Sequence, residues 1–229
     1  GGNDTHPKPG AVGADEVDAY NAAFLVDAKG ELVGRYYKRH LVMFGEYMPG
    51  ARWLPVLARL RSAGAGMRPG KRSITFQLEQ PPARFAPLIC YEDVFPHEVR
   101  SRANPETDFL LNLTNDGWFG QSAAQWQHAQ TALFRAVENG LPLVRCANNG
   151  LTCWIDSRGR IHDVCFSDTE GIYGPGYKVV TVPLCSATTG RCSTFYNRHG
   201  DWFGWSCVGL TLLAGGFRFG RCRMTDRNS

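Results

Sequence analysis

The stretch FAPLICYED, residues 85–93, carries the strongest structural signal in this chain. It begins as an apolar run typical of a buried strand and turns polar directly after Cys90. A helix is predicted over residues 95–102, and a second continuous apolar run follows at residues 108–114. Such runs suit strands that are covered on both faces, and strands that alternate with helices indicate an α/β fold.

The neighbouring segments extend this pattern in both directions. Residues 3–18 are polar and rich in Gly, Pro and Asp, which predicts a loop. The other predicted elements are a hairpin over 22–26 and 32–37 with its turn at Lys29-Gly30, an amphipathic helix over 52–61, and strands over 73–78, 143–147, 151–155 and 179–182.

The longest predicted helix covers residues 121–139 and is stopped by Gly140 and Pro142. Its apolar side chains recur at helical spacing and share one side. These residues are Trp126, Ala129, Leu133, Phe134 and Val137.

Composition excludes several classes of protein. The 229 residues carry 25 Lys and Arg against 21 Asp and Glu, a net charge of +4, which is too small to predict a nucleic-acid partner. The eight cysteines include no CxxC pair and no His at zinc-finger spacing, so we predict no structural zinc site. Phosphate-loop and dinucleotide motifs are absent, and no cofactor or metal is predicted.

An uncharged run of different character lies near the end of the chain. Residues 202–217 contain no charge, and Arg218 begins a cluster of arginines that continues to Arg227. A membrane span needs about 20 apolar residues, so this run is short, but basic residues beyond it favour a membrane flank. We keep two interpretations, a membrane helix and a buried or interfacial helix.

Cys90 and Lys38 are the first candidates for chemistry. Cys90 ends an apolar strand before a helix, and such an elbow exposes a side chain beside backbone N–H groups. Lys38 ends the run at residues 33–37, and a cation there could stabilise an oxyanion or a thiolate. A buried cysteine and a solvated lysine are the alternatives that local sequence leaves open.

The acidic and imidazole groups are less informative. Glu46 lies among aromatic residues and Glu92 lies two residues after Cys90, so each could orient Lys38 or a backbone group, or could be a surface charge. His128 on the long helix is the best candidate for a Cys–His pair, but it is a weak one.

Six stretches carry a resemblance, and they occur in family order. They read YYKRHLVMFGEY at 36–47, ICYE at 89–92, NLTNDGWFG at 112–120, QH at 127–128, RAVEN at 135–139 and NNG at 148–150. They resemble the carbon–nitrogen hydrolase (nitrilase) superfamily and, more closely, its membrane branch, the apolipoprotein N-acyltransferases. The stretch YNRHGDW at 196–202 also resembles that branch's approach to its last membrane helix.

The resemblance implies a four-layer αββα sandwich that is incomplete at its N-terminus. The expected division is a polar loop at 1–19, a partial hydrolase domain at 20–200, and a membrane helix with a basic tail at 201–229. The loops are expected to meet acyl chains through apolar residues that could equally be ordinary core. These are Met43, Phe44, Tyr47, Met48, Trp53 and Trp118.

The resemblance also implies a catalytic arrangement. Cys90 would be the nucleophile and Lys38 its cationic partner, with Lys38 and the Tyr91 N–H holding the oxyanion. Glu46 resembles the acid that orients Lys38, and Tyr91 and Glu92 resemble the pair after the nucleophile.

Two positions depart from the family pattern. The family's general-base Glu lies on an earlier strand, and we do not assign that role to Glu16, which lies in a polar loop. We therefore expect the chain to be the C-terminal part of a longer protein and not to turn over alone. Met43 stands where the family usually has Pro, which we expect to loosen the loop carrying Glu46.

The function that the resemblance implies is acyl transfer. An acyl chain would pass from a phospholipid, through a thioester on Cys90, to the N-terminal amine of a diacylglyceryl-cysteine apolipoprotein. The implied location is a bacterial inner membrane, with the catalytic domain on the periplasmic side. The alternatives are a soluble amidase of the same superfamily and a catalytically inactive fragment that lacks the base.

Overall fold

The strands form two sheets. The computed structural model describes residues 2–7, 17–50, 53, 56, 66–165, 171–184 and 193–225. The smaller sheet has antiparallel strands in the order β1-β2-β3, with bounds Gly2–Pro7, Val17–Val26 and Leu32–Tyr37. Strands β2 and β3 form the predicted hairpin, where Gly30 adopts a φ of 84° at the turn. Only glycine adopts this conformation without strain.

The larger sheet has six strands in the order β4-β5-β6-β7-β8-β9. Their bounds are Phe76–Leu78, Ala83–Ile89, Phe109–Asn115, Leu143–Asn148, Thr152–Ile155 and Ile161–Cys165. Parallel pairing joins β5, β6 and β7, and the outer strands pair antiparallel. The two continuous apolar runs that predicted buried strands form β5 and β6, in the parallel centre of this sheet.

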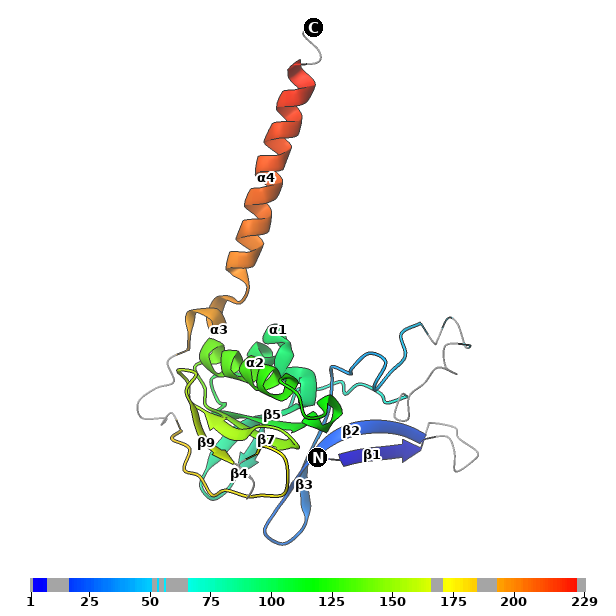
Figure 1. The fold of residues 1–229 in the computed structure, drawn as a ribbon, viewed down its shortest axis with the longest axis vertical. Helices are drawn as coiled ribbons and strands as arrows, with labels where there is room; N and C mark the ends of the chain where they lie inside the picture. The colour runs from blue at the N-terminus through cyan, green and yellow to red at the C-terminus, as the bar shows by residue number, and fades with distance from the viewer. Residues whose placement is uncertain are drawn as a thin grey trace.

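The helices follow the strands directly. The two 3₁₀ helices η2 (Cys90–Val94) and η3 (Asp116–Phe119) continue β5 and β6 at their carboxyl ends. Helices α1 (Pro96–Arg102) and α2 (Ala124–Asn139) lie together over the larger sheet (Figure 1). The chain then forms α3 (Phe195–His199) and α4 (Trp202–Thr225).

Alternation along the central strands builds a core on both faces of the larger sheet. Ala86 and Leu88 of β5 belong to the buried cluster shared with α1 and α2. Phe85 and Ile89 belong to a second cluster with Tyr36 of the smaller sheet, so the two sheets pack face to face. The α/β sandwich is therefore present as helix, sheet and sheet layers. The fourth layer stays a prediction, because the helix expected over 52–61 lies almost wholly outside the described residues.

The side of α2 that carries the large apolar residues is not its buried face. Trp126, Phe134 and Val137 are exposed. The buried residues are Gln125, His128, Ala129, Ala132, Arg135, Ala136 and Asn139. The alanines are small enough for the helix to lie close to the sheet, and His128 and Arg135 bond to groups of η2 and η3 that follow the strands.

Two further predictions need correction. Gly2–Pro7 is a strand rather than a loop, because its backbone pairs with β2 and its polar side chains bond across the sheet. Tyr37 Oη lies 2.7 Å from both Asp4 Oδ2 and His6 Nε2. The strand predicted over 179–182 is irregular chain, and β9 was not predicted at all. The domain limits remain predictions.

Helix α3 is fixed to the domain by side-chain bonds. Arg100 Nε donates to Asn197 O at 2.9 Å, and Arg100 Nη2 donates to Arg198 O at 3.0 Å. Asn197 Nδ2 donates to Ala103 O at 3.1 Å and to Asn139 Oδ1 at 2.9 Å. Contacts with α1 and α2 thus hold α3 immediately before α4 begins.

Helix α4 extends away from the rest of the chain (Figure 1). Large apolar side chains along it are exposed, namely Trp202, Phe203, Trp205, Val208, Leu210, Leu212 and Leu213. Among the described residues, no helix is both long enough and apolar enough to cross a membrane. The predicted membrane helix is thus a helix, but its crossing of a membrane is not confirmed.

A buried ionic cluster joins η2, η3, β7 and α2. His128 lies between two carboxylates, with Nδ1 2.8 Å from Asp116 Oδ1 and Nε2 2.9 Å from Asp93 Oδ1. Arg145 contacts the same carboxylates, at 3.0 Å to Asp93 Oδ2 and 2.7 Å to Asp116 Oδ2. Burial alone would lower the pKa of His128, but the bonds to Asp116 and Asp93 outweigh it and raise the pKa to about 9. The positive charges of protonated His128 and Arg145 then balance the negative charges of Asp93 and Asp116.

We predict that stability falls as the pH rises through 9. A histidine with a raised folded-state pKa stabilises fully below its unfolded pKa of about 6.5, and the stabilisation is lost as His128 deprotonates. Thermal melting between pH 7 and pH 10 measures this loss. The variant His128→Asn should be less stable at pH 7 and should show a smaller decline. Parallel declines in the two proteins would contradict the prediction.

We also predict that Gly150→Ala destabilises the fold. A Cβ at Gly150 would lie 2.5 Å from Asp116 Oδ2, so the buried cluster would have to shift. Overpacking of this kind costs about 1–3 kcal/mol, which urea unfolding can measure. Gly209→Ala is the matched control, because nothing lies within 4 Å of that position in α4. Equal free energies of unfolding for the two variants would show that the Asp116 side chain can move aside without loss of stability.

Candidate active site

Cys90 lies where β5 ends and η2 begins, as the sequence predicted. Its φ is 52°, a left-handed conformation that is strained for a residue with a side chain. The side chain is half-buried, and the carbonyl accepts a bond from Asn112 Nδ2 at 3.2 Å. The elbow therefore places a partly accessible thiol at the carboxyl end of a central strand. Strain of this kind concentrates at functional sites.

Glu92 is a fully buried carboxylate rather than a surface charge. It accepts from both guanidinium nitrogens of Arg102, at 3.0 and 3.1 Å, and from the Tyr36 hydroxyl at 2.7 Å. Burial raises the pKa of Glu92, but the Arg102 bonds and charge lower it below its ordinary value. The carboxylate is therefore ionised and compensated.

Glu92 also connects the two segments that carry the main candidates. Its Oε1 accepts from the backbone N–H of Arg39 at 2.8 Å, directly after Lys38. Its Oε2 accepts from the N–H of Ile89 at 2.8 Å, directly before Cys90. One carboxylate thus fixes the backbone beside Lys38 and beside Cys90. The role of Glu92 is to hold backbone groups, which is one of the two interpretations that the sequence allowed.

Lys38 is buried and paired with Glu46. Its side chain is 1% exposed, and Nζ lies 2.8 Å from Glu46 Oε2 and 2.9 Å from Oε1. Glu46 is itself held by Asn21 Nδ2 at 2.9 Å and by the N–H of Val42 at 2.8 Å. The solvated lysine that local sequence left open is therefore excluded. The ammonium group is a fixed charge, which suits stabilisation of an anion.

Tyr91 is exposed beside Cys90. Its ring lies 6.1 Å from that of Phe95 and 5.9 Å from that of His128, measured between centroids. The first N–H groups of a helical turn have no partner within the turn, so the Tyr91 N–H can point to a ligand. Its role as an oxyanion donor stays a prediction. His128 cannot serve Cys90 as a base in this arrangement, because both ring nitrogens contact carboxylates.

The apolar residues expected around the site are mostly exposed. Trp53 is 86% exposed and Trp118 80%, and Met43 and Phe44 are also exposed, whereas Tyr47 and Met48 are partly buried. Ordinary core is therefore the wrong interpretation for four of the six. Single exposed apolar residues are common, and these four are exposed at positions that follow strands or lie in loops.

Sequence reasoning missed two supporting residues. Asn112 holds the Cys90 carbonyl and also donates to Asp93 Oδ2 at 2.8 Å. An amide inside an apolar strand was the signal that could have identified it. Asn21 on β2 orients Glu46, and nothing in its local sequence indicates this.

Comparison with curated proteins gives a consistent result. The chain is 38% identical over 201 residues to an apolipoprotein N-acyltransferase of Geobacter metallireducens, covering 88% of this chain and 36% of that protein. It is 34% identical over 206 residues to one of Chlorobaculum tepidum, covering 87% and 37%. The chain thus spans about a third of the length of these relatives.

Solved structures are similar in fold at low sequence identity. The amidase NitN of Nesterenkonia sp. AN1 matches with a TM-score of 0.52 and 20% identity, over 87% of this chain and 68% of that one.

A family model agrees with both comparisons. The model of carbon–nitrogen hydrolases matches residues 8–188, which include Lys38, Glu46, Cys90 and Glu92. By sequence and by fold, this chain belongs to the carbon–nitrogen hydrolase family.

Proposed function

We propose that this chain carries the nucleophile of an acyltransferase that moves an acyl chain from a phospholipid to an apolipoprotein. The observation that carries the proposal is that Glu92 holds the backbone directly after Lys38, which is buried and paired with Glu46, and the backbone directly before the strained Cys90. Relatives named apolipoprotein N-acyltransferase support the choice of reaction. The exposed side chains of Met43, Phe44, Trp53 and Trp118 favour a lipid over a small polar amide.

In the proposed reaction, the Cys90 thiolate attacks the ester carbonyl of a phospholipid. The Lys38 ammonium and the Tyr91 N–H stabilise the oxyanion, and the lysophospholipid leaves with a proton. The neutral acceptor amine then attacks the thioester, gives up one proton to the general base as the amide forms, and releases the thiolate of Cys90. The resemblance places the general base on an earlier strand, and we assign no residue of this chain to it.

We further propose that α4 contacts the membrane that holds the donor. The helix presents a long series of exposed apolar side chains, and contact with water is unfavourable for them. A bacterial inner membrane, with the domain on its periplasmic side, is the location that fits this donor and acceptor.

The first prediction concerns the nucleophile. A chimaera that joins this chain to the remaining part of the Geobacter metallireducens relative should form an acyl adduct on Cys90 when incubated with phospholipid vesicles. Peptide mass spectrometry locates the adduct. Cys90→Ala should abolish both adduct and transfer, because no thioester can form.

Cys146→Ala is the matched control, since Cys146 is an exposed thiol outside the elbow. That variant should keep the activity of the parent chimaera. An adduct on Cys146 would contradict the assignment, and consumption of a small amide in place of phospholipid would favour the amidase.

The second prediction concerns α4. The double variant Leu210→Glu, Leu213→Glu should bind phospholipid vesicles much more weakly in a flotation assay, because both side chains are exposed on α4, at 66% and 61%. Phe134→Glu is the control, since Phe134 is an exposed apolar residue of α2. Equal loss in both variants would show that α4 has no special role in lipid binding.

A further inference from the structure

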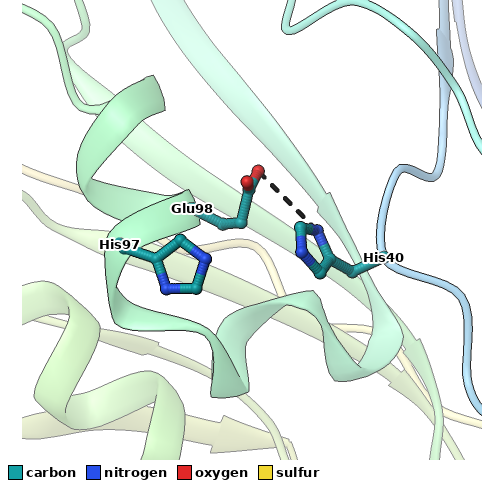
Figure 2. A group of neighbouring side chains, drawn as sticks. All are labelled: His40, His97 and Glu98. Atoms are coloured by element: carbon teal, nitrogen blue, oxygen red, sulfur yellow. Dashed lines mark ion pairs between the residues drawn. The ribbon is translucent and has the colours of Figure 1, made fainter.

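The side chains of His40, His97 and Glu98 form a cluster beside the candidate active site. Each offers one possible ligand atom, and these three atoms lie within 4.8 Å of one another. Figure 2 shows His97 and Glu98 on α1, with His40 facing them from the segment after β3. No other group of three or more His, Cys, Asp or Glu side chains meets this criterion within the described part of the chain.

Two atoms of the cluster are buried without a hydrogen bond. Nδ1 of His40 and Oε2 of Glu98 have no hydrogen-bond partner among the described residues, and they lie 3.8 Å apart. Glu98 Oε2 is nevertheless balanced by ion pairs with Arg39 and Arg102, so His40 Nδ1 is the atom left without a partner, and buried polar atoms nearly always have one. A proton on His40 Nδ1 or a bridging water could join the two atoms, and a metal cation bound by both is the third arrangement that would do so.

We propose that His40, His97 and Glu98 bind a divalent transition-metal ion of the zinc type. Two imidazoles and one carboxylate are a donor set that zinc accepts, with water in the fourth position. The cysteine spacings gave no signal for this site, because none of its ligands is a cysteine. The inference does not depend on the proposed acyl transfer.

The geometry needs only a small adjustment. Donors bound to tetrahedral zinc lie roughly 3.4 Å apart, so His40 Nδ1 and Glu98 Oε2 have to approach by less than about 1 Å. The His40 ring packs on the Phe95 ring, 4.6 Å between centroids, which keeps it directed to α1. The His97 side chain is exposed, so its ring can turn toward the ion.

Two arginines oppose the ion and limit its affinity. Arg39 Nη1 lies 3.1 Å and Arg102 Nη2 lies 3.5 Å from Glu98 Oε2. Arg102 is engaged with Glu92, whereas Arg39 is a partly exposed side chain that competes directly with the ion. We therefore expect moderate affinity, which rises when Arg39 loses its charge.

Binding would connect the Lys38 segment to α1. His40 is two residues after Lys38, and its own N–H lies 3.3 Å from Glu92 Oε1. A metal bond to the His40 ring would add a link from this segment to α1, beside the Glu92 bonds that join it to η2. The ion would hold the backbone beside Lys38 without touching the reacting atoms.

Zinc chloride titrated into the whole chain by calorimetry, with far-ultraviolet circular dichroism to verify folding, tests the site. We expect one ion to bind, His97→Gln to weaken binding at least about tenfold, and Arg39→Gln to tighten it. His199→Gln is the matched control, because His199 is an exposed histidine of α3. It should leave the affinity unchanged.

Cobalt substitution identifies the ligands independently of folding effects. A visible cobalt spectrum without a thiolate charge-transfer band, lost in His97→Gln, is the expected result. A thiolate band that persists in His97→Gln would assign the metal to cysteines and overturn the proposal. Absence of zinc binding, or equal binding by His97→Gln and the parent chain, would overturn it as well.

Discussion

The architecture around the candidate site depends on one buried ion pair, Glu92 with Arg102. The carboxylate accepts bonds from the end of β3, from the last residue of β5 and from α1, so three elements share it. Removing one partner of such a pair typically costs about 3–5 kcal/mol, because the remaining charge stays buried. The pair therefore fixes where strands from both sheets end, and with them the backbone that carries Lys38 and Cys90.

Local patterns were enough to predict most of the central strands and helices. Continuous apolar runs identified β5 and β6, and the turn at Lys29-Gly30 identified the hairpin of the smaller sheet. The orientation of α2 could not be predicted from periodicity. Its largest apolar side chains, such as Phe134, face outward, because the inner face needs small residues and the polar groups that bond to Asp93 and Asp116. Strand β1 was missed for a related reason, since its polar residues bond across a sheet.

The residues of the candidate site also divide into those that the sequence could predict and those that it could not. Cys90 and Lys38 stood out because each ends an apolar run, and Glu46 because aromatic residues surround it. The connections between them involve residues far apart in sequence, such as Glu92 with Arg39 and Asn21 with Glu46. Spacing in one chain does not report such contacts. For the same reason, the His40 side chain could not be associated with His97 and Glu98 before the fold was known.

The attachment of α3 has a mechanical consequence. A helix that extends from a domain transmits an applied force to that domain. Where the force arrives depends on the contacts that hold the base of the helix. Here the base is α3, which Arg100 fixes to α1 through two backbone carbonyls. A force on α4 would therefore pass through α3 to α1, and also to α2, which holds α3 through Asn139. Because α1 also carries Arg102, the strain would arrive at the charge that compensates Glu92, so a pull on the distant helix acts on the support of the Cys90 elbow.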